Sequence, residues 1–75
     1  RDRLITFKDI NFKDLMKELE KNFGIRIIID NHTLDNYACS GKFRISDGIE
    51  QVLRALQQDA HFTFERESGT EIRIQ

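Results

Sequence analysis

The sequence predicts a small α+β domain built from duplicated βαβ units, in the order β-α-β-β-α-β-β. Two segments share the same helical spacing of apolar residues, and alternating apolar and polar segments stand before and after each of them. One such unit cannot cover its own apolar face. We therefore expect both helices to pack against small two- and three-stranded sheets in a single domain spanning residues 1–75.

The first half begins with an alternating segment, residues 4–8, whose Ile5 and Phe7 share one face of a predicted strand. A helix follows, because five apolar residues recur at i, i+3, i+4, i+7 and i+11, namely Phe12, Leu15, Met16, Leu19 and Phe23. Gly24 stands directly after this stripe, where a left-handed residue commonly ends a helix. Residues 25–30 are rich in isoleucine and predict a second strand.

The second half repeats this plan. A strand is predicted over residues 37–44, with three side chains on one parity, Tyr37, Cys39 and Phe43. Asp47 is the predicted N-cap of the next helix, and Glu50, three residues on, completes a capping box. The helix shows the spacing of the first one, at Ile49, Val52, Leu53, Leu56 and Ala60. Alternating segments on either side of Ser68-Gly69 predict a closing hairpin.

Sliding one half onto the other places Ile49 on Phe12 and Phe62 on Ile25, so the match continues from the helices into the strands after them. This favours a true duplication; the alternative is that any two amphipathic helices share the template. The centre of the expected core comes from both helices, at Leu15, Leu19, Phe23, Val52, Leu53 and Leu56.

The bulk composition narrows the classes of function. Charged residues make up 33% of the chain and the formal net charge is -1, whereas a nucleic-acid-binding module carries a basic excess. No apolar run approaches the roughly 20 residues that a membrane-spanning helix needs. The chain begins with Arg1 rather than Met, so we expect it to be a piece of a longer protein.

The sequence offers no pattern of residues that carries chemistry. His32, His61 and Cys39 do not stand at the spacing of a zinc site. Cys39 shares the parity of predicted core residues, which favours a buried and inert thiol over a reactive one. The glycines form no phosphate-binding loop. We therefore expect no catalytic residue, no cofactor, no metal and no small-molecule ligand.

Protein surface remains as the candidate site, since the edges of short sheets can accept a partner's strand. We predict partner contacts at four strand positions, Arg26, Ile28, Lys42 and Arg44. Ile28 lies on the opposite parity from Ile27, so it is either an exposed apolar residue or one covered by a loop. For the arginines, the alternative is a scattered role in solubility.

The stretch "GKFRISDGIEQVLRALQ" and its spacing back to Tyr37 resemble the C-terminal domain of FecR-like anti-sigma factors of the Bacteroidetes type. The resemblance extends from about Leu4 to Ile74, and the layout is also similar to the secretin and TonB short N-terminal (STN) domain. Two departures stand out. The first helix of the family often starts with Thr-Pro where this chain has Ile10-Asn11, and the position of Cys39 is often aromatic.

This resemblance implies a periplasmic receiver domain in a single-pass inner-membrane protein. Such a domain binds the signalling domain of a TonB-dependent outer-membrane transporter, while a cytoplasmic part of the same protein holds an extracytoplasmic-function sigma factor. An alternative is the N-terminal signalling domain of the transporter itself. A third reading, a small ligand-binding or catalytic domain, needs a pocket with convergent polar groups that the sequence does not offer.

Overall fold

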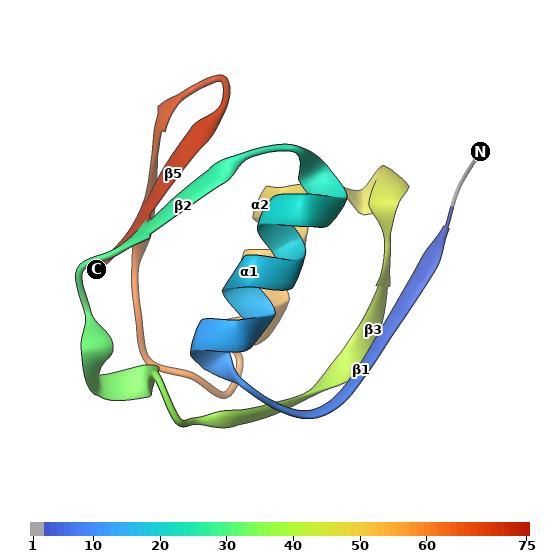
Figure 1. Cartoon of the computed structure of the whole chain (residues 1–75), viewed down its shortest axis with the longest axis horizontal. Coiled ribbons are helices and arrows are strands. Elements are labelled where there is room, and N and C mark those ends of the chain that lie inside the picture. The colour runs from blue at the N-terminus through green and yellow to red at the C-terminus, as the bar shows by residue number, and fades with distance from the viewer. Residues whose placement is uncertain (1–2) are drawn as a thin grey trace.

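The computed structural model describes residues 3–75, and it contains the predicted order of strands and helices (Figure 1). The first half consists of β1 (Leu4–Asn11), α1 (Phe12–Phe23) and β2 (Arg26–Ile29). The second half consists of β3 (Ala38–Arg44), α2 (Ile49–Leu56), β4 (Phe64–Ser68) and β5 (Glu71–Ile74). Single 3-10 turns, η1 (His32–Leu34) and η2 (Ile45–Asp47), flank β3. Residues 1 and 2 of the predicted domain lie outside the described residues.

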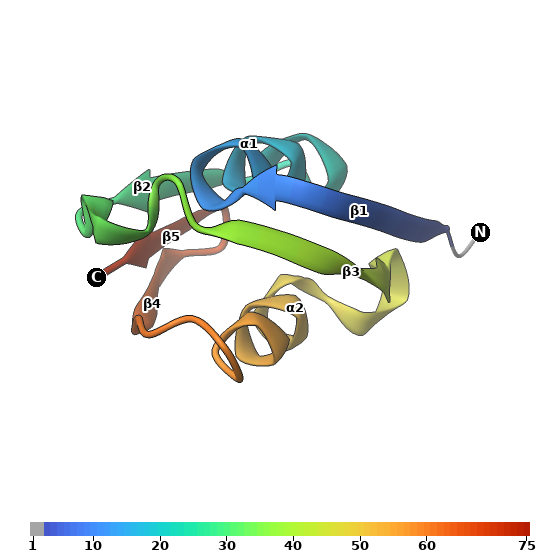
Figure 2. The same cartoon turned by 90° about the horizontal axis from the view of Figure 1, so that it is seen from below.

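The strands form the two sheets that the sequence predicts. β1 and β3 pair antiparallel, and in the other sheet β5 lies between β2, which is parallel to it, and β4, which is antiparallel. The helices lie between the two sheets, with β1 on the side of α1 and β3 on the side of α2 (Figures 1 and 2). The fold is therefore an α+β domain, as expected.

The two ends of α1 have clear local causes. The side-chain oxygen of Asn11 accepts a hydrogen bond from the backbone N–H of Asp14 at 2.8 Å, so Asn11 is the N-cap. Asparagine thus supplies a side-chain cap at the start of this helix. Gly24 adopts φ 62° and ψ 40° and donates its N–H to the carbonyl of Glu20, which confirms the predicted left-handed end.

The start of α2 differs from the prediction. Gly48 is its N-cap, with φ 85° and no side-chain capping bond, so the predicted capping box of Asp47 and Glu50 is wrong. The turn η2 lies between β3 and the helix and places Asp47 before the cap position. The Asp47 carboxylate instead accepts the backbone N–H of Arg44 at 3.2 Å. Glu50 turns to β4 and pairs with Arg66.

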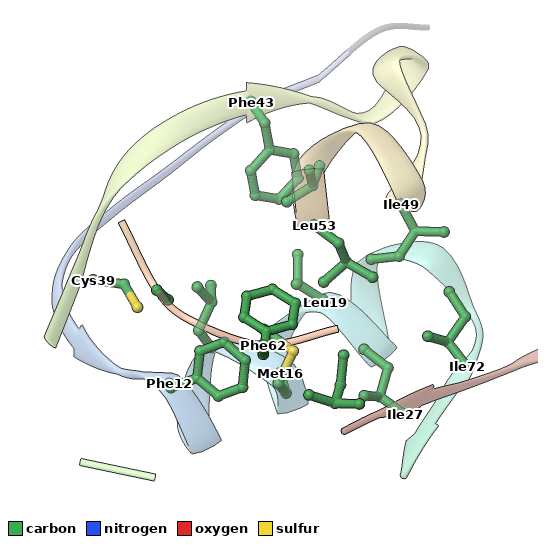
Figure 3. Packing of buried hydrophobic residues seen from close by; sticks show 14 residues of the cluster. Phe12, Met16, Leu19, Ile27, Cys39, Phe43, Ile49, Leu53, Phe62 and Ile72 are labelled. Atoms are coloured by element: carbon green, nitrogen blue, oxygen red, sulfur yellow. The ribbon is translucent and has the colours of Figure 1, made fainter. Parts of the chain in front are cut away.

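The core lies between the sheets and takes side chains from both helices and most strands (Figure 3). Its fully buried large side chains are Phe12, Leu15, Met16, Leu19, Leu53, Ile72 and Ile74. Leu15, Leu19, Val52 and Leu53 are buried as predicted. Phe23 and Leu56 are only partly buried at the border of this core, so their predicted central place is wrong. Leu56 is left at the border because the two-stranded sheet does not extend over that side of α2.

Strand β1 is longer than the predicted residues 4–8, and it contains a bulge. The pairing with β3 shifts register between Phe7 and Ile10, and Asp9 has a positive φ of 50°. The N–H of Asp9 donates to the hydroxyl of Ser40 at 3.0 Å. The bulge lies on β1 alone, so β3 runs continuously past it.

Candidate functional site

The structure places the four predicted contact residues on two different sheets. Arg26 and Ile28 belong to β2, at one edge of the three-stranded sheet, and Lys42 and Arg44 belong to β3 in the two-stranded sheet. The helices lie between these sheets, so the four side chains do not form one patch (Figure 1). They define two separate surfaces, which we call the β2 surface and the β3 surface.

The β2 surface is a charged ladder around one apolar side chain. Arg26 pairs with Glu71 on the neighbouring strand β5, with Nε and Oε2 4.0 Å apart, and Ile28 stands opposite Arg73. The Arg73 guanidinium donates to Asp30 at 2.8 Å, and this hydrogen bond raises the pKa of Arg73 above its ordinary value. Ile28 is half-buried and lies outside the core cluster. The arginines on this face are thus engaged by carboxylates within the domain.

The β3 surface is a strand edge. Just beyond the two ends of the β1–β3 ladder, the backbone N–H of Ile45 donates to the carbonyl of Arg3, and the backbone N–H of Phe12 donates to the carbonyl of Tyr37. These two hydrogen-bonded pairs fix which residues of the ladder are hydrogen-bonded to each other. Because such pairs alternate along an antiparallel ladder, the backbone N–H and C=O groups of Ala38, Ser40 and Lys42 face away from β1. The edge of β3 that carries Lys42 is therefore not part of any sheet within residues 3–75.

A groove of about 330 Å³ runs along this edge. One wall is β3 itself, and the other is the face of α2 with the turn that follows it. The lining residues are Tyr37, Ala38, Cys39, Ser40, Gly41, Lys42 and Phe43 with Phe7 on the first side, and Val52, Ala55, Leu56 and Asp59 on the second. Tyr37, expected on the buried parity of β3, is 38% exposed at the end of the groove.

A second groove of about 280 Å³ lies at the opposite edge of the same sheet, between β1 and α1. Its lining includes Thr6, Lys8, Glu18 and Asn22. The guanidinium of Arg3 donates to the side chain of Asn22 at 2.9 Å, which ties the start of β1 to the end of α1. The two grooves are related by the internal duplication, since each lies between the first strand of a half and the helix of that half.

The titratable side chains do not converge. The thiol of Cys39 is buried, which raises its pKa, and it points to the carbonyl of Tyr37 at 3.6 Å. A raised pKa keeps the thiol protonated and therefore unreactive, as expected for a core cysteine. His32 contacts Asp35 at 3.1 Å on the surface. Within residues 3–75, no three His, Cys, Asp or Glu side chains are grouped so that they could hold a metal ion.

A second charged cluster links the helix and the sheet of the second half. Glu50 on α2 accepts a hydrogen bond from Nε of Arg66 at 2.7 Å and lies 3.9 Å from Arg54. The bond from Arg66 is the main reason why the pKa of Glu50 is lowered from its ordinary value of 4.5. Sequence reasoning missed this contact because it gave Glu50 a capping role. The contact joins α2 to β4 and is structural.

Residues 3–75 contain no helix long and apolar enough to span a membrane. Among known proteins, a family model described as the C-terminal domain of FecR matches residues 4–74. No curated protein and no solved structure matches the chain. The matched range begins with β1 and ends with β5, so it includes both sheets, both helices and both grooves.

Proposed function

Because the chain belongs to the family of FecR C-terminal domains, we propose that it is the receiver domain of a transmembrane anti-sigma factor. Membership makes it a regulatory domain of anti-sigma-factor type. The finer proposal is that it binds the signalling domain of a TonB-dependent outer-membrane transporter. The signal then passes to an extracytoplasmic-function sigma factor held by a cytoplasmic part of the same protein. The domain itself lies in the periplasm, anchored through a single inner-membrane helix.

The match over residues 4–74 is the observation that carries this proposal. It agrees with the motif Gly41–Gln57 that the sequence shows, and the chemistry of the described residues is compatible with it. The carboxylates of Glu50, Asp30 and Glu71 are all engaged by arginines. The remaining accessible features are strand edges and grooves, which suit protein contacts rather than a reaction.

The test is an NMR titration of the ¹⁵N-labelled chain with the isolated signalling domain of the transporter encoded beside its gene. We expect saturable amide shifts in one contiguous patch. Shifts around Arg26 and Ile28 would assign the contact to the β2 surface, and shifts around Lys42 and Arg44 would assign it to the β3 surface. The charge reversals Arg26→Glu and Lys42→Glu form a matched pair, because only the one in the contact surface should weaken binding.

The proposal fails if the signalling domain causes no saturable amide shifts at high concentration. It also fails if the shifts are scattered over the domain and neither Arg26→Glu nor Lys42→Glu changes the affinity for the signalling domain. A serum albumin titration at the same concentration is the control for non-specific binding. A patch that spans neither surface would keep the receiver role and overturn the four predicted contact residues.

A further inference from the structure

The four outer edges of the two sheets differ in how well they are closed against another strand. Unpaired edges are usually blunted by bulges, short length or capping side chains, because an open edge accepts foreign strands. β1 is interrupted by its bulge at Asp9. β2 has four residues, and its Ile27 N–H donates to the carboxylate of Glu20 at 2.7 Å. Two of the four edges are therefore obstructed.

The third edge, β4, is obstructed as well. Its register shifts between Arg66 and Ser68, and the Arg66 guanidinium donates to the carbonyls of Ser68 and Gly69 at 3.2 and 3.1 Å. β3 has none of these devices between Ala38 and Lys42. The first outward-facing backbone group of β3 after this stretch that has a side-chain partner is the N–H of Arg44, which donates to the Asp47 carboxylate. Within residues 3–75, the stretch Ala38–Lys42 is thus the regular open edge.

The groove beside this edge has the form that an added strand requires. A strand hydrogen-bonded to β3 points alternate side chains to the two sides of the sheet. Those on the inner side would lie over the groove floor, where Ala55 is exposed and Leu56 is only partly buried. Figure 2 shows that β3 leaves this side of α2 uncovered. A third strand would therefore cover apolar surface as well as satisfy backbone groups.

The side chains on the outer face of β3 set the charge that the occupant of the groove must carry. Lys42 points outward on β3, and within residues 3–75 it forms no ion pair. Opposite charges directly across two strands stabilise a pairing. The carboxylate in the groove lining, Asp59, lies in the turn after α2, on the wall opposite to Lys42. Acidic side chains thus fit the outer side of the added strand, and small apolar ones fit the inner side.

A second copy of this chain does not meet these requirements through the same edge. The inner side chains of its own β3, Cys39 and Phe43, are already buried in its own core at 4% and 8% exposure. They are not available to enter the groove. The occupant must be a segment that is extended and uncovered before it binds.

We infer that the edge of β3 from Ala38 to Lys42 and the groove floored by Ala55 and Leu56 form a strand-addition site. Its occupant is an extended segment of a partner protein with alternating acidic and small apolar residues. The site is derived from this chain alone, so it goes beyond the proposed function and stands whether or not the natural partner is a transporter.

The test uses a synthetic peptide of alternating Glu and Val residues as the probe, with a Lys and Val peptide of equal length as its counterpart. NMR titration of the ¹⁵N-labelled chain should show saturable shifts at Ala38–Lys42 and Ala55 with the acidic peptide. Because the outward charge is positive, the basic peptide should bind at least about tenfold more weakly.

A pair of proline variants tests the backbone contact, with Lys42→Ala as the reference because Lys42→Pro removes the charge as well as the N–H. Lys42→Pro removes an N–H that faces away from β1, so the β1–β3 ladder keeps its hydrogen bonds. Thr6→Pro makes the same change at the position directly opposite, on the other edge of the same sheet. Lys42→Pro should bind the peptide about tenfold or more weakly than Lys42→Ala, and Thr6→Pro should bind it less than about threefold more weakly than the unaltered chain.

A second pair keeps the test decisive if a proline variant does not fold. Lys42→Glu should reverse the preference between the acidic and basic peptides, and Lys17→Glu, an equal charge change on α1, should not. The inference is overturned if millimolar acidic peptide causes no shifts, if both peptides bind equally, or if the shifts lie along β1. Self-association of the chain that Lys42→Pro abolishes would also overturn it, since a second copy would then be the occupant.

Discussion

The ring of Phe7 on β1 lies against Gly41, its partner on β3, so closely that a Cβ on Gly41 would stand 3.3 Å from Cζ of Phe7. This contact sets the position of Phe7 in a row of three rings. Phe7 packs on Phe43 with centroids 5.9 Å apart, and Phe43 stacks on Phe23 at the same distance. The row joins the two-stranded sheet to the end of α1, so the missing side chain at Gly41 is part of the packing.

Gly41→Val should therefore destabilise the domain, although valine favours strands in general. The added side chain would push Phe7 out of its place, and overpacking of this kind costs about 1–3 kcal/mol of unfolding free energy. Urea denaturation gives the difference. The matched control is Gly69→Ala, because no atom lies within 4 Å of a Cβ added at Gly69. Equal stability of Gly41→Val and wild type would contradict the packing of Phe7.

Leu19 and Leu56 hold equivalent positions in the two helix patterns, but their replacement by alanine should change the free energy of unfolding by different amounts. Leu19→Ala empties a site of 0% exposure and should cost about 2–5 kcal/mol. Leu56→Ala should cost less than about 2 kcal/mol, because Leu56 is already partly exposed to water in the groove. Chemical denaturation of both variants checks this order. A larger loss for Leu56→Ala would mean that Leu56 is central to the core after all.

The caps of the two helices lead to a prediction for hydrogen exchange. Asn11→Ala should cost about 0.5–2 kcal/mol and speed exchange of the Asp14 amide, because it removes the N-cap bond. Asp47→Ala should speed exchange of the Arg44 amide and leave the first turn of α2 unchanged. Faster exchange at the start of α2 in Asp47→Ala would restore the capping role that the sequence suggested.

The contact between Glu50 and Arg66 predicts a dependence of stability on pH. The pKa of Glu50 is lowered in the folded domain, so the contact stabilises above the unfolded value of about 4.5. This contribution is lost as the pH falls through the lower folded pKa. Glu50→Gln should therefore lower stability at neutral pH and flatten its decline in acid, measured as urea midpoints across that range.

A double-mutant cycle gives the control for this pair. Because Arg66 is the main partner of Glu50, Arg66→Ala should reproduce much of the loss at neutral pH, and the double variant should lose less than the sum of the two. Strict additivity would show that the 2.7 Å contact does not contribute to stability.

Much of the secondary structure could be predicted from the sequence because its causes are local. The apolar stripe from Phe12 to Phe23 repeats with the period of a helix, and Gly24 ends it in a left-handed conformation. The closing hairpin was predicted on the same grounds. The start of α2 was not, since Asp47 and Glu50 match a capping box in sequence while the turn η2 and Arg66 give both carboxylates other partners.

The candidate site was predictable only in part. Lys42 and Arg44 were predicted as strand residues with exposed side chains, and this is where the structure has them. The groove beside them was missed, since it depends on where α2 lies relative to β3. No feature of the sequence indicated the bulge near Asp9. This bulge interrupts the outer edge of β1, whereas the outer edge of β3 stays regular.

By itself, the sequence determined the helices, most strand positions and the membership of the chain in a regulatory family, because periodicity, caps and motifs are properties of neighbouring residues. Only the tertiary structure decided which strands pair. β2 lies parallel to β5 rather than next to β4, and β1 pairs with β3 across most of the first half of the chain. These pairings arise because the five short strands divide into two sheets that cover the helices from opposite sides. The open edge of β3 is the consequence, since a two-stranded sheet is too narrow to cover both α1 and α2.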